Sequence, residues 1–464
     1  MAACATAVAQ QKHSRKVTTV PITVETTPRT DPAIQAAMKD VSSAQMKATL
    51  QKLVSFGTRN TISTVTPEQT KAGHGIGAAR EWIKSEFQRY SDACGGCLEV
   101  KEDRFTEAPA ARIPQPTEIV NVYAILRGTD PQAAKNIYLV SGHYDSRATD
   151  VLDANAPAPG ANDDGSGVAV VLEAARVLSK HKFPGTIIFL AVAGEEQGLN
   201  GSRHFAKMAN DQGWQIEGVL NDDTVGGDKS PGQENLLRVF AEGIPLVDVQ
   251  GQGDIKALRM IRGLGDENDS NSRELARYIN PVAKTYQRTL PATELAPVTI
   301  YRPDRYLRGG DHTSFNEQGY AAVRLTEWRE NYDRQHQNPR TENGKQYGDL
   351  LEFVNFDFLA NVARLNVATL ASLASCPAKP GNVRLLTKDL TNDSTLTWES
   401  VPNATGYEIV WRDTTAPEWQ NVKTVPASEK QATIDVSKDN VIFGVRAVCG
   451  NGAASLAVVP VPER

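Results

Sequence analysis

Residues 136–146 read NIYLVSGHYDS, residues 167–181 read GVAVVLEAARVLSKH, and residues 185–196 read GTIIFLAVAGEE. The first and third segments are apolar runs without regular polar alternation, which is typical of strands that are covered on both faces. The segment between them has the apolar spacing of an amphipathic helix. A strand, a helix and a strand in this order predict a βαβ unit within a mostly parallel sheet.

Further segments extend this pattern in both directions. Residues 217–227 and 320–328 each contain another short apolar run that ends in polar residues, and helical spacing recurs at 46–59, 75–90 and 350–374. We therefore expect an α/β domain over residues 41–375, with a mixed, mostly parallel central sheet and helices on both faces. Residues 1–40 lack clear periodicity and are expected to be a leader and an extended arm.

The pattern changes after the Pro/Gly-rich linker SCPAKPGNV at 375–383. Four later segments are β-rich or alternate between apolar and polar residues: STLTWES, TGYEIVWRD, QATIDVS and NVIFGVRAVCG. Their spacing predicts a small all-β sandwich over residues 380–464.

Composition restricts the partners and the cellular location. The formal charge of -5 argues against an electrostatic nucleic-acid partner, and no run approaches the roughly 18 apolar residues of a membrane helix. The start, MAACATAVAQQ, contains a stretch similar to the cleavage end of a signal peptide, so we expect a secreted or periplasmic protein. Cys94 and Cys97 in CGGC are interpreted as a tight disulfide, with a redox or metal site as the alternative.

Polar residues follow the first predicted strand and precede the predicted helix. His143 and Asp145 lie two residues apart, and a carboxylate beside an imidazole commonly orients the imidazole as a metal ligand. Asp163 and Asp164 lie in the glycine-rich loop 159–167, where the simpler interpretation is a helix cap with an acidic first turn. Ligands of open α/β sheets bind beyond the carboxyl ends of the strands, where these polar residues gather.

Three further motifs add acids and a second histidine. Glu195 and Glu196 are expected to face different ways at a strand end, so that one can bind a metal while the other titrates beside the substrate. The other two motifs are the pair Asp222 and Asp223 in VLNDDTVGG and the pair Asp311 and His312 in GGDHTSFNEQG.

Carboxylates together with imidazole suit zinc, with manganese or cobalt as substitutes. Two ions about 3.5–4 Å apart would use one bridging carboxylate and two terminal ligands each. Two histidines, two terminal acids and one bridging acid complete that scheme. Each motif alone has an ordinary structural explanation, and the set is what predicts a metal centre.

In this order, the motifs HxD, NDDGSG, GEE with GSRHFA, VLNDD and DHTSF resemble those of co-catalytic di-zinc aminopeptidases of the bacterial leucyl aminopeptidase type. That family also includes glutamate carboxypeptidase and the transferrin receptor ectodomain. The resemblance covers residues 50–374 and implies the zinc exopeptidase fold, two Zn²⁺ ions and peptide substrates with a free N-terminus.

The same resemblance implies a role for each matching residue. Glu195 is expected to be the general acid/base, with Asp145 orienting a metal-bound histidine, and a cis peptide bond is expected after Asp163. The metal ligands that it implies are His143 and Asp223 for one ion, Glu196 and His312 for the other, and Asp163 as the bridge.

Other functions of the same scaffold remain alternatives. A carboxypeptidase or dipeptidase would need a cationic clamp for the terminal carboxylate, which the motifs do not locate. A glutaminyl cyclase is less favoured because only QGLN separates the paired glutamates from GSRH. A receptor-like ectodomain would be expected to lack ligands or the base.

The C-terminal segment resembles a fibronectin type III domain, with Trp398 in its second strand and Tyr407 in its third. In that topology Cys376 and Cys449 lie at the same pole, so the resemblance makes a disulfide between them feasible. Such a domain usually binds or spaces, and a polymer or a protein is its expected ligand.

The remaining histidines have no matching motif and are interpreted as structural or surface residues: His13, His74, His181, His204 and His336. Arg324 lies in an apolar run and is expected to pair with an acid. The side-chain specificity pocket is expected between Asp228 and Asp304, a stretch without a readable motif.

Overall fold

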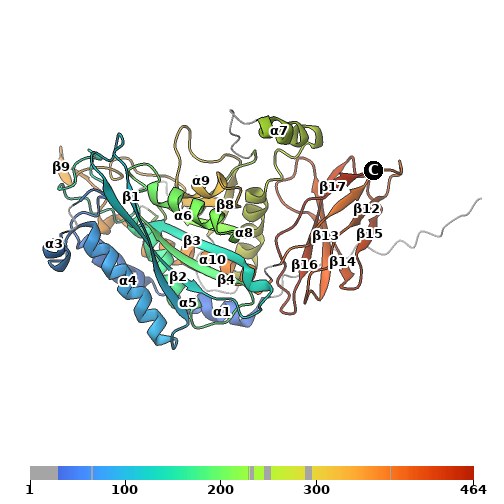
Figure 1. The fold of residues 1–464 in the computed structure, drawn as a ribbon, viewed down its shortest axis with the longest axis horizontal. Helices are drawn as coiled ribbons and strands as arrows, with labels where there is room; N and C mark the ends of the chain where they lie inside the picture. The colour runs from blue at the N-terminus through green and yellow to red at the C-terminus, as the bar shows by residue number, and fades with distance from the viewer. Residues whose placement is uncertain are drawn as a thin grey trace, which may run out of the picture.

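The computed structural model has an eight-stranded central sheet with helices on both faces and smaller sheets at the C-terminal end (Figure 1). It describes residues 30–63, 66–227, 229, 235–244, 252–287, 295–376 and 378–464. The expected mixed α/β class is confirmed. The expected leader lies mainly in residues 1–29, outside the described residues.

The central sheet has the strand order β1-β2-β4-β3-β5-β8-β6-β7. Its middle strands β4, β3, β5 and β8 are parallel to one another. Antiparallel pairing joins β1 to β2, β2 to β4, and β6 to β8. The strands are β1 (Leu98–Glu107), β2 (Thr117–Leu126), β3 (Asn136–His143), β4 (Thr186–Val192), β5 (Gln215–Asp222), β6 (Leu236–Ala241), β7 (Ala296–Ile300) and β8 (Ala322–Glu327).

Strand β4 shows why its sequence does not alternate between apolar and polar residues. All seven of its residues are buried. Phe189 packs in the core on one face of the sheet, while its neighbours Ile188 and Leu190 pack in a separate core on the other face. Because successive side chains point to opposite faces, a strand covered on both sides needs an unbroken apolar run.

Helices cover both faces of the sheet. α4, α5, α8 and α10 contribute to the larger core on one face, and α6 and α9 contribute to the smaller core on the other. The helices are α1 (Pro32–Asp40), α2 (Ser43–Val54), α3 (Pro67–Lys71), α4 (Gly75–Ala93), α5 (Gly165–Leu178), α6 (Asn200–Asp211), α7 (Gln252–Leu264), α8 (Asn271–Gln287), α9 (Asp311–Asn316) and α10 (Phe356–Ser375), with short 3-10 helices at Ala133–Lys135 and Leu351–Phe353.

Part of the expected extended arm is a helix instead. Residues 32–40 form α1, which begins after Asp31, whose side chain accepts a hydrogen bond from the backbone N–H of Ala33. Pro32 fits the first helical position because its missing N–H would have no partner there. Ile34 and Met38 are buried in the main core, and α1 packs on α10. Burial of this short apolar face explains why the segment is helical although its periodicity is weak.

Four strands of the central sheet were not expected. β1 and β2 form a hairpin at one edge, and β6 and β7 form the other edge. β1 is largely charged because much of it is only partly buried at the sheet edge. The sequence pattern of such a strand resembles that of a polar loop, and a short strand such as β7 provides few residues for a periodicity.

Helix α10 is long and apolar enough, by length and composition, to cross a membrane. However, 89% of its apolar window is buried inside the protein. It packs against α5, α8, β3 and β4, where an apolar surface on nearly every side is required. Its composition is therefore that of a core helix.

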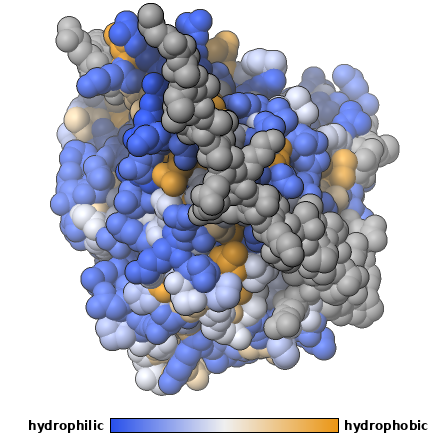
Figure 2. Space-filling model, turned by 90° about the vertical axis from the view of Figure 1, so that its right-hand side faces the viewer, coloured by the Kyte–Doolittle hydropathy of each residue, from blue (hydrophilic) through white to orange (hydrophobic). Residues whose placement is uncertain are grey.

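The C-terminal residues form two small sheets with a core of their own, at one end of the molecule (Figure 1). That end is largely hydrophilic, with scattered hydrophobic side chains (Figure 2). The resemblance to a fibronectin type III domain stays a prediction. The strands are β11 (Arg384–Leu386), β12 (Ser394–Thr397), β13 (Gly406–Asp413), β14 (Asn421–Pro426), β15 (Gln431–Ile434), β16 (Val441–Val448) and β17 (Val461–Glu463). A separate hairpin in the α/β region consists of β9 (Arg340–Glu342) and β10 (Lys345–Tyr347).

Covalent and polar contacts attach the C-terminal sheets to the α/β region. A disulfide joins Cys376, at the end of α10, to Cys449, after β16. A second disulfide, which joins Cys94 to Cys97, lies within the α/β region. On α8, Arg277 donates to the carbonyl of Pro417 over 2.9 Å, and the Tyr278 hydroxyl donates to that of Ala454. These contacts fix the position of the C-terminal sheets beside α8.

Helix α5 approaches strand β3 closely at two glycines. A Cβ added to Gly142 would lie 2.5 Å from the backbone carbon of Gly167, and one added to Gly167 would lie 2.2 Å from the carbonyl oxygen of Asp222. The neighbouring atoms are backbone and cannot rotate away. The carboxyl ends of β3 and β5 are therefore held against the start of α5.

We expect Gly142→Ala to lower the free energy of unfolding by about 1–3 kcal/mol, because the new methyl group overpacks a rigid contact. Chemical unfolding followed by circular dichroism measures the change. Gly263→Ala in α7 is the matched control, since its Cβ would meet nothing within 4 Å. Equal stability of Gly142→Ala and the natural protein would contradict the close approach.

Candidate metal centre

Five acidic or imidazole side chains converge at the carboxyl edge of the parallel strands. His143 is the last residue of β3, and Asp223 follows the last residue of β5. Glu195 and Glu196 lie just beyond the end of β4, and Asp163 lies directly before Asp164, the N-cap of α5. Because β3, β4 and β5 are parallel neighbours, their ends bring these residues together.

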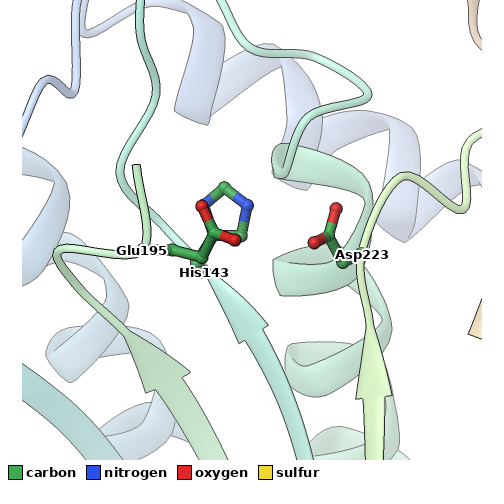
Figure 3. A group of neighbouring side chains, drawn as sticks. All are labelled: His143, Glu195 and Asp223. Atoms are coloured by element: carbon green, nitrogen blue, oxygen red, sulfur yellow. The ribbon is translucent and has the colours of Figure 1, made fainter. Parts of the chain in front are cut away.

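The first group consists of His143, Glu195 and Asp223. One ligand atom from each lies within 4.8 Å of the others. Figure 3 shows that the three side chains come from the ends of neighbouring strands and extend into the same space. His143 and Asp223 are buried, and Glu195 is partly exposed.

The second group consists of Asp163, Glu196 and His336, also within 4.8 Å. The Nε2 atom of His336 lies 2.9 Å from Oδ2 of Asp163 and 3.0 Å from Oε1 of Glu196. The other oxygen of Asp163 lies 3.2 Å from Nε2 of His143. Asp163 therefore connects the two groups, with one carboxylate oxygen toward each.

The structure does not bring His312 into either group, and His336 lies where the sequence interpretation expected His312. His312 is buried in α9, where its Nε2 lies 2.7 Å from the carbonyl oxygen of Pro303. This contact directs the ring toward the 303–304 segment and away from Glu196. The sequence interpretation assigned His336 no partner because the surrounding residues DRQHQ form no motif.

The position of His336 in the sequence could nevertheless have indicated that it lies near the other candidate ligands. His336 lies in the segment after β8, the strand that pairs in parallel with β5. Polar residues after such a strand reach the same edge as those after β3, β4 and β5.

Asp222 and Asp223 separate into two roles at the end of β5. The carboxylate of Asp222 accepts a hydrogen bond of 2.9 Å from Asn366 of α10, on the side of the helical core. Asp223 points toward His143 and Glu195 instead. Successive residues at a strand end face opposite sides, which explains the division.

Asp164 connects three segments that carry candidate ligands. Its carboxylate accepts hydrogen bonds from the backbone N–H groups of His143 at 2.9 Å, Gly167 at 2.9 Å and Thr224 at 3.2 Å. The bond from Gly167 caps α5. The peptide bond between Asp163 and Asp164 is cis, as the resemblance implied. Asp164 thereby fixes the segments of His143, Asp163 and Asp223 relative to one another.

Asp145 connects the remaining strand end. Its carboxylate accepts hydrogen bonds from the backbone N–H groups of Glu195 at 3.3 Å and Glu196 at 3.1 Å, and from the hydroxyl of Thr61 at 2.9 Å. One of its oxygens also lies 3.4 Å from Nδ1 of His143. Asp145 therefore orients both glutamates as well as the imidazole.

A buried arginine and a partly buried histidine lie beside these acids. Arg324 on β8 lies 3.0 Å from the carboxylate of Asp223 and 3.3 Å from that of Asp304, so the expected pairing with an acid is confirmed. Burial alone would lower the pKa of His336, but Glu196 and Asp163 outweigh that effect and raise it to about 10.

The electrostatic surroundings of Glu195 raise the pKa of its carboxyl group. Removal from water raises the pKa of its carboxyl group, His143 opposes the rise, and the nearby Glu196 and Asp223 reinforce it. A carboxyl group with a raised pKa can exchange a proton closer to neutral pH.

The two groups line one cleft of about 440 Å³. Asp163, Glu195, Glu196, Asp223 and His336 all form part of its wall. A pair of zinc ions fits this donor set, since carboxylate oxygens and imidazole nitrogens are common zinc ligands and a bridging carboxylate is present. Without cations, four acids in one cleft would repel one another strongly.

His204 keeps the structural role expected for it. It lies on α6, where its ring stacks on Phe105 with centroids 3.9 Å apart and its Nδ1 lies 3.0 Å from Asp103. These contacts place it outside the two candidate groups.

Comparison with known proteins identifies relatives over nearly the whole chain. The model of Peptidase family M28 matches residues 121–355. A probable zinc metalloprotease of Pyrenophora teres f. teres is 45% identical over 437 residues, covering 93% of this chain and 87% of that protein. A probable zinc metalloprotease of Leptosphaeria maculans is 44% identical over 441 residues, covering 94% of this chain and 98% of that protein.

A solved structure supports the fold independently. The Legionella pneumophila LapA aminopeptidase is similar to this chain with a TM-score of 0.50 and 22% sequence identity, over 74% of each chain. The likeness extends over most of the α/β region in length and shows a shared fold.

We expect His336→Gln to reduce zinc affinity more strongly than the roughly 10–100-fold loss of an outer hydrogen-bond partner. The change removes a candidate ligand from the Asp163–Glu196 group. Bound zinc is measured by mass spectrometry after dialysis against a competing chelator. His312→Gln serves as the comparison and should retain zinc while lowering thermal stability, because His312 contacts Pro303 and Asp304 and belongs to neither ligand group. Loss of zinc in His312→Gln but not in His336→Gln would show that His312, and not His336, is the zinc ligand.

Proposed function

The chain belongs to peptidase family M28 and is a zinc metalloprotease, and on this basis we propose that it is a di-zinc aminopeptidase. The single observation that carries the proposal is a cleft lined by four carboxylates and His336, with His143 3.2 Å from one of these carboxylates. The terminal ammonium of a peptide is complementary to such an acidic site. The structural likeness to LapA, which is an aminopeptidase, agrees with this choice.

The two ions would be held by residues that already lie together. His143 and Asp223 would bind one ion, Glu196 and His336 the other, and Asp163 both. Asp163 can complete both groups because its two oxygens face different histidines. Glu195 is then left free of a ligand role.

Glu195 would act as the general base and acid of peptide hydrolysis. Bound zinc supplies Lewis-acid polarisation of the scissile carbonyl and lowers the pKa of a water molecule. The carboxylate of Glu195 accepts the proton of the attacking water and donates it to the leaving amine. Asp145 keeps Glu195 in place by accepting a hydrogen bond from the backbone N–H of Glu195. The raised pKa of the Glu195 carboxyl group suits both proton transfers.

Secretion is part of the proposal. The two disulfides support it, because stable disulfides are mostly found in proteins of oxidising compartments. The small-residue stretch near the N-terminus is consistent with an export signal. A secreted zinc aminopeptidase would shorten peptides outside the cell.

We expect Glu195→Gln to lower kcat by about 100–10,000-fold while zinc remains bound, because an amide cannot accept the proton. Glu196→Gln should instead weaken zinc binding, because it replaces a charged ligand. Steady-state kinetics and metal analysis of the two variants separate these effects. If both variants lost zinc to the same degree, the division of roles between the glutamates would be wrong.

The reaction itself is tested with matched substrates. Aminoacyl anilides should be hydrolysed, and the same compounds with an acetylated N-terminus should not. Exhaustive chelation should abolish activity, and added zinc should restore it. Equal hydrolysis of N-acetylated substrates, or activity that survives chelation, would contradict a zinc aminopeptidase.

Thiol labelling of protein purified from culture medium tests the proposed compartment. Of the five cysteines, four form disulfides in the structure, so at most one reactive thiol is expected before reduction. Four or five reactive thiols, or protein retained inside the cell, would argue against secretion.

A further inference from the structure

The acidic cleft is also lined by five arginines: Arg112, Arg147, Arg305, Arg308 and Arg324. Three of them pair with carboxylates. Arg305 and Arg308 pair with Glu330 at 2.7 and 3.3 Å, and Arg324 pairs with Asp223 and Asp304. These pairs account for much of the positive charge on that side of the cleft.

Arg112 and Arg147 differ from the other three. Arg112 donates to the backbone carbonyl of Glu196 over 2.9 Å. Arg147 donates to the carbonyls of Ala148 at 3.2 Å and Thr149 at 2.9 Å. Within the part of the chain that the structure describes, neither guanidinium forms an ion pair with a carboxylate. Each therefore retains donors for another group.

Both arginines line the cleft on segments that are joined to the second ligand group. Arg112 lies in a tight turn that is closed by two hydrogen bonds between Ala110 and Ile113, and the side chain of Ile113 is buried. Its contact with Glu196 places it beside the second ligand group.

Arg147 lines the cleft from a segment of the chain other than that of Arg112. It lies beyond the end of β3, in a segment where Thr149 and Asn338 exchange hydrogen bonds of 2.8 and 3.1 Å. Asn338 lies two residues after His336. The segment of Arg147 is thereby joined to the segment of His336, and Arg147 lines the same cleft as the second group.

Two cleft arginines without ion-pair partners among the described residues favour the binding of an anion. Metal ions would neutralise the negative charges of Glu196, Asp163 and Asp223. Glu195 keeps its negative charge beside the substrate ammonium, and these two guanidinium groups line the same cleft. A guanidinium binds a carboxylate with two parallel hydrogen bonds, which is a geometry that suits neither a neutral amide nor an ammonium group.

We propose that Arg112 and Arg147 bind a carboxylate of the peptide substrate, so that the enzyme prefers peptides with an anionic group close to the cleaved bond. The inference rests on the proposed peptidase function and names its substrate class. The carboxylate comes from an acidic side chain or from the free C-terminus of a short peptide. Arg112 and Arg147 are specificity-determining residues in both cases.

A matched set of tripeptides distinguishes the two sources of the carboxylate. Ala-Ala-Ala is compared with its C-terminal amide, and amidated peptides containing Glu are compared with the same peptides containing Gln at each position. We expect about 10-fold higher kcat/KM for the peptide that carries the recognised carboxylate, mainly through a lower KM. A preference within the first pair identifies the C-terminus, and a preference within the second identifies a side chain.

Substitutions then test the two arginines. Arg147→Gln and Arg112→Gln should each remove most of that preference, while Arg147→Lys should restore part of it because it keeps the charge. Arg384→Gln is the control, since Arg384 lies on β11 in the C-terminal sheets and its side chain donates to Asn382. A zinc content equal to that of the natural protein would show that Glu196 is still correctly placed in the Arg112→Gln variant.

Equilibrium binding provides a readout that does not depend on turnover. In a Glu195→Gln background, calorimetry with the preferred intact tripeptide should show about 10-fold weaker binding when Arg147→Gln is added. Equal kcat/KM for carboxylate and amide peptides, or a preference unchanged in both arginine variants, would overturn the inference and leave the aminopeptidase proposal standing. Absence of hydrolysis from any free N-terminus would overturn both.

Discussion

The carboxylate of Asp164 is the interaction on which the candidate site depends. It accepts backbone hydrogen bonds from His143, Gly167 and Thr224, which belong to the end of β3, the start of α5 and the segment after β5. Three ligand-bearing segments are therefore fixed by one buried side chain. The close approach of Gly142 to Gly167 requires the same geometry, because α5 must touch β3 for its N-cap residue Asp164 to accept the backbone N–H of His143.

The site also shows how a protein can concentrate acids without losing its fold. Asp145 and Asp164 use their oxygens to accept backbone N–H groups, whereas Asp163, Glu196 and Asp223 direct theirs into the cleft. The first kind orients the second. Arg324 offsets part of the remaining charge, and metal ions held with His336 would offset the rest. Acids next to each other in the sequence, such as Asp163 and Asp164, thus have different tasks because the backbone turns between them.

Two differences between the expectations and the structure have physical causes. His312 follows Asp311 in a glycine-rich loop and matched a motif, but it lies in a short helix whose packing turns the ring toward Pro303. His336 matched no motif, because its position depends on the path of the chain after β8. Similarly, β1 is strongly charged, and its place at the sheet edge results from pairing with β2 along its whole length. Such pairing joins residues that a local pattern cannot relate.

The sequence pattern predicted the class of fold and the succession of strand, helix and strand, and the family resemblance named five residues that the structure brings together: His143, Asp163, Glu195, Glu196 and Asp223. The sequence could do so because a doubly covered parallel strand needs an unbroken apolar run, and the residues that follow such runs meet at one edge. Only the tertiary structure decided which histidine joins Glu196, how Asp145 and Asp164 connect the strand ends, and that five arginines line the same cleft. These features depend on contacts between segments far apart in the chain, where the direction of each side chain is set by packing and hydrogen bonds and not by local pattern.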